Sequence, residues 1–251
     1  MPLVLTWPEQ NRQQVLLEYY HRLLAELGPQ GWWPARTRLE VILGAILVQN
    51  TAWQNARLAL ARLRKAGSLN LARLRDMPRS ELEDYIRPAG FYRQKARTIQ
   101  NFLDWLGRAH AWSLDRLFER PTDEVRRELL SLKGLGPETV DAILLYAGRH
   151  PWFVADAYTR RILARHELVP AADGYAAVQQ FLHQHLPADH TLYNEYHALL
   201  VEVGKRYCRN PAPRCDACPL RDFLPKQAPG VAMTDGVMIA QSTALTRPPA
   251  S

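Results

Sequence analysis

The stretch 131-SLKGLGPETVDAILLYAG-148 has a helical pattern that is interrupted by Gly-Leu-Gly-Pro and then resumes. Gly134 and Gly136 can supply the positive φ angles of a tight turn, and Pro137 suits the first position of the second helix. The turn would expose the amides of Leu135 and Gly136 beside a helix N-terminus, which is a natural site for a phosphate group. Turn chemistry alone fits an ordinary corner between two helices equally well.

Most of the chain on either side also has the apolar periodicity of helices. Residues 39–50 are apolar on all sides, which predicts a buried central helix. The segment 151–155 is the only candidate for an extended strand, and residues 228–251 lack periodicity and predict a disordered tail. We therefore predict an all-α fold. The expected helices span 8–28, 39–50, 51–66, 70–76, 79–86, 91–108, 112–119, 122–132, 137–147, 157–167, 174–186 and 190–207.

Composition and charge are those of a globular protein with some preference for polyanions. Of the 251 residues, 47% are hydrophobic and 23% are charged, and the formal net charge is +7. A basic balance raises the expectation of a nucleic-acid partner without establishing it. The opening MPLVLTWPEQ lacks the pattern of a secretory signal, and no apolar run approaches about 20 residues. We therefore expect a cytosolic protein with no membrane partner.

The chain has three cysteines, and they lie close together in the sequence. Six residues separate Cys208 from Cys215, and two residues separate Cys215 from Cys218. An odd, clustered set of cysteines in a reducing compartment argues against disulfides and favours a metal site.

Several segments, taken in order, resemble the helix-hairpin-helix superfamily of DNA glycosylases, which is the family of endonuclease III. The hairpin is followed by a Gly- and Pro-containing loop at 148–151 and by an aspartate within 153-FVADAYTRRIL-163, and the resemblance covers roughly residues 30–225. It implies a monomer of two α-helical domains, with double-stranded DNA across the cleft between them and the damaged nucleotide flipped into that cleft. The implied domains are 30–150 and 1–29 plus 151–227, followed by the tail at 228–251.

Asp156 occupies the family position of the catalytic carboxylate. A glycosylase breaks the C1′–N bond, and the sugar gains oxocarbenium character as the base leaves. A carboxylate near C1′ can stabilise that charge and orient or deprotonate water. Aspartate is also a favoured N-cap, so Asp156 equally suits the start of a helix at Ala157, and both roles can hold.

Glu138 stands where bifunctional members of the family place a lysine. That lysine forms a Schiff base with C1′, which leads to strand cleavage, and a carboxylate cannot form an imine. Lys133 precedes the turn, where the family has no nucleophile. The resemblance therefore implies a monofunctional glycosylase that leaves an abasic site. Glu138 is expected in the active site, although an acid in the first turn of a helix is also favoured by the helix dipole.

The aromatic segments GWWP and EVILGAILVQNTAW, followed by RPAGFYRQKAR, resemble the bacterial 3-methyladenine DNA glycosylases built on the endonuclease III framework. In that branch the base pocket is lined by residues that match Trp32, Trp33, Pro34 and Trp53. Electron-poor alkylated purines stack well on tryptophan, whereas packing within the core is the alternative interpretation.

Further residues are expected to meet DNA. Gln49 matches the family position that fills the gap left by the flipped nucleotide, and a helix-end glutamine bonded to the backbone is the alternative. Arg93, Lys95 and Arg97 are expected to face either a phosphate path or plain solvent.

The spacing Cys208-x6-Cys215-x2-Cys218 matches the first three ligands of the [4Fe–4S] loop in the endonuclease III family. The fourth ligand would stand at position 224, where this chain has Leu224. The resemblance leaves three alternatives open. In the first, three thiolates hold a cluster together with a water or a carboxylate such as Asp222. In the second the cluster is unstable and easily oxidised, and in the third the loop is a remnant without a cluster. A structural zinc site would also be incomplete. The expected role of a cluster is to stiffen a loop whose arginines meet DNA phosphates.

The sequence thus predicts a base-excision repair glycosylase that hydrolyses the N-glycosidic bond of alkylated purines such as 3-methyladenine in bacterial nucleoid DNA. One alternative is a glycosylase for oxidised pyrimidines or mismatched bases, because pocket shape separates these substrates and sequence does so poorly. A second alternative is a non-catalytic damage-binding protein, which the missing lysine and fourth cysteine suggest. Asp156 opposes it, since a binding module needs no carboxylate that faces a phosphate backbone.

Overall fold

The computed structural model describes residues 11–225, which form helices joined by short loops. These residues contain no β-strand, which confirms the predicted all-α class for this part of the chain. The first ten residues and the predicted tail at 228–251 lie outside the described residues. No helix within 11–225 is long and apolar enough to cross a membrane.

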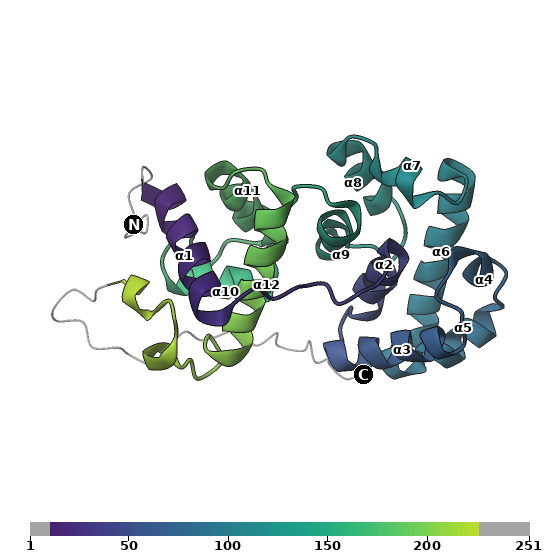
Figure 1. Cartoon of the computed structure of the whole chain (residues 1–251), viewed down its shortest axis with the longest axis horizontal. Coiled ribbons are helices and arrows are strands. Elements are labelled where there is room, and N and C mark those ends of the chain that lie inside the picture. The colour runs from purple at the N-terminus through teal and green to yellow at the C-terminus, as the bar shows by residue number, and fades with distance from the viewer. Residues whose placement is uncertain (1–10, 226–251) are drawn as a thin grey trace, which may run out of the picture.

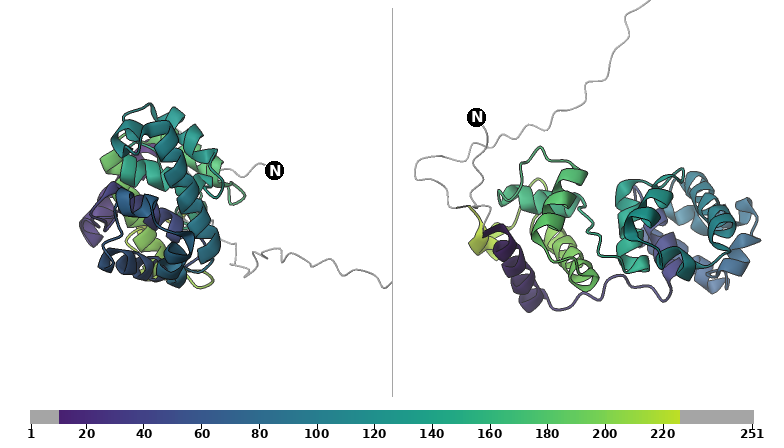
Figure 2. Two further views of the ribbon diagram at one scale, coloured as in Figure 1. Left: turned by 90° about the vertical axis from the view of Figure 1, so that its right-hand side faces the viewer. Right: turned by 90° about the horizontal axis from the view of Figure 1, so that it is seen from above.

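The helices gather into two groups that lie next to each other along the long axis of the molecule (Figure 1). Two chain segments, 28–37 and 149–156, cross between the groups (Figure 2). The predicted domain boundaries near residues 30, 150 and 227 remain predictions. The larger group consists of α2 (Arg38–Leu47), α3 (Trp53–Lys65), α4 (Leu71–Arg75), α5 (Arg79–Ile86), η2 (Arg87–Ala89), α6 (Tyr92–His110), α7 (Leu114–Phe118), α8 (Thr122–Leu130), α9 (Pro137–Ala142) and η3 (Ile143–Gly148). The smaller group consists of α1 (Arg12–Leu27), α10 (Ala157–Arg165), α11 (Tyr175–His185), α12 (His190–Arg206), η4 (Cys215–Ala217) and η5 (Arg221–Phe223).

Helix α2 is the central helix of the larger group, and every residue from Leu39 to Leu47 is buried. Its start is fixed by Thr37, whose hydroxyl accepts a hydrogen bond from the amide of Glu40. The Glu40 carboxylate in turn accepts from the amide of Arg36, which completes a reciprocal cap. The helix ends at Leu47, earlier than predicted, because the chain turns through Asn50 at a φ of 51°.

The hairpin between α8 and α9 differs in two details from the prediction. Gly134 has a φ of 101°, and a Cβ there would clash with the hydroxyl of Thr98 on α6, so glycine is required for both reasons. Gly136 is extended, with φ −94° and ψ 170°, so the predicted positive φ is wrong for this residue. The amide of Leu135 donates to the carbonyl of Leu132 over 3.1 Å, and the prediction that this amide is exposed is therefore wrong.

The second hairpin helix is not one regular α-helix, as predicted for 137–147. The α-helical part α9 ends at Ala142 and continues as the π-helical turn η3, from Ile143 to Gly148. Single π-helical turns within helices are frequent at functional sites. Here the turn packs against α2 and α12, so it brings its side chains to the boundary between the two groups of helices.

Candidate active site

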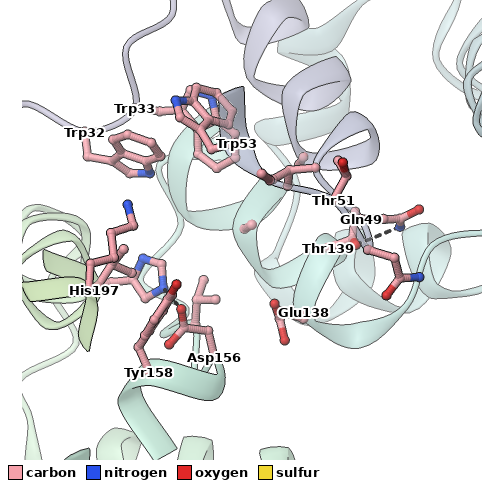
Figure 3. A pocket seen from close by; sticks show the side chains of 18 residues that line it. Trp32, Trp33, Gln49, Thr51, Trp53, Glu138, Thr139, Asp156, Tyr158 and His197 are labelled. Carbon is pink, nitrogen blue, oxygen red and sulfur yellow. Dashed lines mark hydrogen bonds and ion pairs between the residues drawn. The ribbon is translucent and has the colours of Figure 1, made fainter. Parts of the chain in front are cut away.

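A cavity of about 350 Å³ lies between the two groups of helices and takes its lining from both (Figure 3). The loop 48–52 and helix α9 line one side, and residues 154–158 and helix α12 line another. The segment 28–37 contributes two tryptophans. The cavity brings together most of the residues that the sequence nominates, namely Trp32, Trp33, Gln49, Trp53, Glu138 and Asp156.

Three tryptophans form one aromatic cluster at this cavity. The ring centroid of Trp53 is 5.1 Å from that of Trp32 and 5.1 Å from that of Trp33, and the adjacent pair is 5.3 Å apart. Trp33 also contacts Tyr146 of η3, with 5.4 Å between centroids. The rings therefore pack on one another, as the core-packing interpretation predicts, and they also line the cavity, as the pocket interpretation predicts. Pro34 is not brought into the cavity, because it is the exposed middle residue of a tight turn from Trp33 to Ala35.

Asp156 caps helix α10 and faces the cavity. Its Oδ1 accepts a hydrogen bond of 2.8 Å from the amide of Thr159, and its Oδ2 is 3.6 Å from Nε2 of His197. Burial by itself would raise the pKa of this carboxyl. The nearby imidazole of His197 and the hydrogen bond from the Thr159 amide together outweigh burial and lower the pKa of Asp156 below its usual value. The structure thus keeps a buried carboxylate ionised at the wall of the cavity.

Glu138, in the first turn of α9, has the opposite electrostatic setting. The residue as a whole is exposed, but its carboxyl lies against the cavity wall. Loss of water there and the negative charge of Asp156 raise the pKa of Glu138, and His197 and Arg160 reduce this effect only in part. Two carboxyls whose surroundings move their pKa values apart are suited to different chemical roles.

Gln49 links the loop after α2 to the hairpin. Its Nε2 donates to the carbonyl of Gly134 over 3.1 Å and to the hydroxyl of Thr139 over 2.8 Å. The backbone bond agrees with the simple structural interpretation of this glutamine. The same bonds also fix its side chain at the edge of the cavity, beside the hairpin.

Lys95 is not on a phosphate path, and it is not solvated. It is only 2% exposed, and its Nζ donates to the carbonyls of Leu47 (2.9 Å) and Ala89 (2.7 Å). Burial lowers the pKa of this ammonium. The expectation for Lys95 is therefore wrong, because its long side chain turns inward to hold the end of α2 against the segment before α6. Arg93 and Arg97 are exposed.

Sequence reasoning missed the part of the cavity that α12 supplies. His197, Val201 and Lys205 line it, and their spacing of four residues places them on one face of the helix. The Nζ of Lys205 lies 5.7 Å from the centroid of Trp32. This spacing was visible in the sequence, but nothing local showed that this face of α12 meets Asp156.

The three cysteines converge on a second, much smaller cavity of about 20 Å³. Leu224 lines the same cavity, and Nη1 of Arg165 is 3.3 Å from Sγ of Cys208. Burial, with smaller contributions from the charges of Cys208 and Cys215, raises the pKa of the Cys218 thiol. The three thiols thus lie close enough for the charge of one to affect the pKa of another.

Among residues 11–225, none of those that line this cavity supplies a fourth cysteine, histidine or carboxylate beside the three thiols, apart from His166 on the side of Tyr19. Asp222 is exposed and forms ion pairs with Arg22 (3.4 Å) and Arg221 (3.6 Å), so it is already bound elsewhere. No group of three or more His, Cys, Asp and Glu side chains within 11–225 could hold a single metal ion. Cys208, Cys215 and Cys218 therefore keep the sequence spacing of three cluster ligands, and Leu224 stands where the fourth ligand would be.

The fold and the cavity define a helical DNA-repair protein with an aromatic pocket beside a buried carboxylate. Residues 43–188 match the HhH-GPD superfamily of base excision DNA repair proteins, and the chain belongs to this family. It is a DNA N-glycosylase. A protein of Methanocaldococcus jannaschii that is provisionally named a DNA repair glycosylase is 38% identical over 86% of this chain and 98% of its own length.

Other relatives agree with this assignment. Endonuclease III of Sulfolobus acidocaldarius is 28% identical over 75% of this chain and 82% of that protein. The crystal structure of the H. pylori 3-methyladenine DNA glycosylase bound to 1,N6-ethenoadenine has a TM-score of 0.67 and 27% identity, and it covers 78% of this chain and 97% of that one. A complex of endonuclease III with DNA, at 22% identity and a TM-score of 0.71 over 84% of this chain and 94% of that one, shares the fold.

Proposed function

We propose that the protein hydrolyses the N-glycosidic bond of alkylated purines, chiefly 3-methyladenine, and leaves the DNA strand intact. The observation that carries this proposal is one cavity lined by Asp156, three tryptophans and a carboxylate at position 138. The H. pylori relative supports it, because that protein is named a 3-methyladenine glycosylase and its structure holds a purine adduct.

The tryptophan cluster suits an electron-poor base. A flipped base presents a flat π-face, and stacking on an aromatic side chain is worth about 1–3 kcal/mol per base. An adenine alkylated at N3 carries a positive charge in the nucleotide. The electron-rich faces of Trp32 and Trp53 and the nearby carboxylates therefore favour it over the neutral, undamaged base.

The two carboxyls divide the hydrolysis between them. The C1′–N bond breaks with its electrons on the base, so cationic 3-methyladenine leaves as a neutral molecule and needs no proton. Asp156, held ionised, stabilises the oxocarbenium charge on the sugar. Water adds to C1′ as the base departs and gives its proton to Glu138, whose raised pKa makes it the better proton acceptor of the two.

The strand stays intact because the hairpin offers no amine to C1′. Glu138 stands at the position of the family's lysine and cannot form an imine. Among the residues that line the cavity, Lys205 is the one primary amine, and it lies over Trp32 on the side proposed for the base.

We place double-stranded DNA across the mouth of the cavity, bound by a monomer in the bacterial cytoplasm. The hairpin at 134–136 contacts one strand, and Gln49 fills the gap that the flipped nucleotide leaves. Lys95 holds Leu47 and Ala89 together, which sets Gln49 and the 67% exposed Phe91 on neighbouring loops. Phe91 is then suited to insert between bases of the duplex.

Cys208, Cys215 and Cys218 are proposed to hold a [4Fe–4S] cluster by three thiolates, with a ligand from solvent at the corner that Leu224 faces. When bound, such a cluster would cross-link the loop after α12 and would take no part in the hydrolysis. Arg165, which donates to Cys208, and the nearby Arg221 supply positive charge for the thiolates.

The test is a panel of duplexes that differ only in one base: 3-methyladenine, 1,N6-ethenoadenine, an oxidised pyrimidine, a G·T mismatch and undamaged adenine. We expect release of 3-methyladenine in preference to all others. Release of the oxidised pyrimidine or the mismatched thymine alone would assign the protein to the endonuclease III type instead. Binding without release of any base would show a damage-binding protein.

A further inference from the structure

Two buried side chains behind Asp156 have no role in the scheme above. Tyr146 of η3 and His197 of α12 are 9% and 7% exposed, and the Tyr146 hydroxyl lies 2.5 Å from Nδ1 of His197. The other ring nitrogen, Nε2, is buried and has no hydrogen-bond partner within 11–225. It points to Oδ2 of Asp156, 3.6 Å away, as Figure 3 shows.

An unpaired buried nitrogen is costly, so its direction is informative. A distance of 3.6 Å is slightly too long for a hydrogen bond, and a small movement of either side chain would close it. The contact lies within the smaller group of helices, where α10 and α12 pack along each other, and the bond from Tyr146 comes from η3 of the larger group. The ring is thus held firmly on one side and meets Asp156 on the other.

We propose that His197, oriented by Tyr146, is the positioning residue that keeps Asp156 ionised and aimed at the sugar during base release. The inference rests on the proposed function and extends it by two residues. His197 does not touch the reacting atoms in this scheme and acts through Asp156.

The direction of these hydrogen bonds follows from which atoms of Tyr146 and His197 carry a proton. Complete burial raises the pKa of Tyr146 well above its ordinary value, so the phenol keeps its proton. Its alternative acceptor, the carbonyl of Asn194, is farther away at 3.5 Å. The phenol therefore donates to Nδ1, which places the remaining ring proton on Nε2, where it faces Asp156.

Other charges near this chain of contacts are few and belong to identifiable elements. They come from α9, α10 and α12, and the groups are Glu138, Asp141, Arg160, Glu195 and Lys205. None of them is hydrogen-bonded to Asp156 among the described contacts, whereas His197 meets it directly. Removal of His197 should therefore change the ionisation of Asp156 more than any other single substitution here.

The experiment measures single-turnover release of 3-methyladenine between about pH 4 and pH 8 for the wild type and three variants. Release requires ionised Asp156, so the rate falls on the acid side of the profile. His197→Leu should move that acid limb upward by about one pH unit, with a roughly tenfold loss below it. His197→Gln keeps an N–H near the position of Nε2 and should restore the limb in part. Tyr146→Phe should shift it less, in the same direction.

The chain offers a matched control in a second buried tyrosine–histidine pair. Tyr19 is fully buried, and its hydroxyl lies 2.7 Å from Nδ1 of His166, remote from the cavity. Tyr19→Phe removes the same O–H group and should leave the pH profile unchanged. Equal profiles for Tyr19→Phe and Tyr146→Phe, together with an unmoved limb in His197→Leu, would overturn the proposal.

A binding measurement separates this inference from the proposed substrate. Duplexes with a pyrrolidine abasic analogue, whose ring ammonium imitates the oxocarbenium charge, are compared with the neutral tetrahydrofuran analogue. The wild type should prefer the charged analogue, and His197→Leu should reduce the preference roughly tenfold at acid pH. An unchanged preference would contradict the role of His197. Failure of the wild type to release 3-methyladenine, with this preference intact, would refute only the substrate. If His197→Leu does not fold, His197→Gln and Tyr146→Phe decide by the same two readouts.

Discussion

Helices α10 and α12 pack side by side and carry two different sites, one at each end of α10. At one end, Asp156 begins α10 and His197 of α12 faces it across the aromatic cavity. At the other end, about 13 Å along α10, Arg165 and Cys208 meet beside the small cysteine cavity. Each end also has one buried tyrosine–histidine pair.

The two ends differ in the space that their polar groups surround. Around Asp156, a backbone amide and an imidazole lower the pKa of the carboxyl, and a second carboxyl with a raised pKa and a cavity lie beside it. Around the cysteines, three donors converge but Leu224 closes the fourth side. The first site therefore leaves room for a substrate beside a charged group, whereas the second is nearly closed.

The largest effect should come from Asp156→Asn. Asparagine is as good a helix cap as aspartate, so the melting temperature should change little. The lost negative charge should reduce the rate of base release by about a thousandfold. Single-turnover assays beside thermal melts check this. A loss of activity that merely follows a loss of folded protein would count against a chemical role for Asp156.

Glu138→Gln should have the next largest effect, a reduction of about a hundredfold in the rate of release. Because the pKa of Glu138 is raised, the residue becomes ionised only at a pH above its usual range, and a base role requires that ionised form. The wild-type rate should therefore rise through a second limb on the alkaline side of the Asp156 limb. The variant should lack this limb. A pH–rate profile with both limbs intact in Glu138→Gln would show that Glu138 only interacts with the dipole of helix α9 and takes no part in the reaction.

Trp32→Ala should cost about tenfold in release of 3-methyladenine, in keeping with the loss of one stacking surface. Trp32→Phe, which keeps a flat ring, should recover most of the rate. Equal losses in the two variants would indicate that the indole has a specific packing role. Competition assays between alkylated and undamaged duplexes measure the effect on selectivity directly.

The smallest effect on catalysis should come from the cysteine end. Leu224→Cys supplies the missing donor and should slow the loss of iron to a chelator severalfold, whereas Cys215→Ser should lower iron content and melting temperature. Iron and sulfide analysis with visible absorption follows both. The rate of release per folded molecule should stay within about twofold of wild type. Absence of iron and sulfide from wild-type protein purified without oxygen would show that the loop is a remnant.

Local patterns were enough to predict much of this molecule. Helix periodicity gave the elements to within a few residues, since the apolar faces that pack are visible in the sequence. Asp156 was recognisable because its two proposed roles, cap and catalyst, depend on the short segment around it. Gly134 was also recognisable, because a positive φ in a tight turn nearly requires glycine.

Features that depend on contacts between distant segments escaped prediction. Lys95 is buried because two carbonyls, at the ends of α2 and η2, accept its ammonium, and no nearby residue signals this. His197 lies 41 positions after Asp156 in the sequence, and only the packing of α12 on α10 brings them together. Pro34 follows the tryptophan pair in sequence but occupies the outside of a turn.

The most direct test of the central claim uses one duplex with a single 3-methyladenine. Released base and strand breaks are counted before and after alkali, and borohydride is added to trap any imine. We expect one alkali-labile site per released base, no break before alkali, and no trapped complex. Glu138→Lys, which restores an amine at this position, serves as the control for trapping. Breaks before alkali, with a trapped complex that disappears in Lys205→Met, would contradict the account and identify Lys205 as a nucleophile.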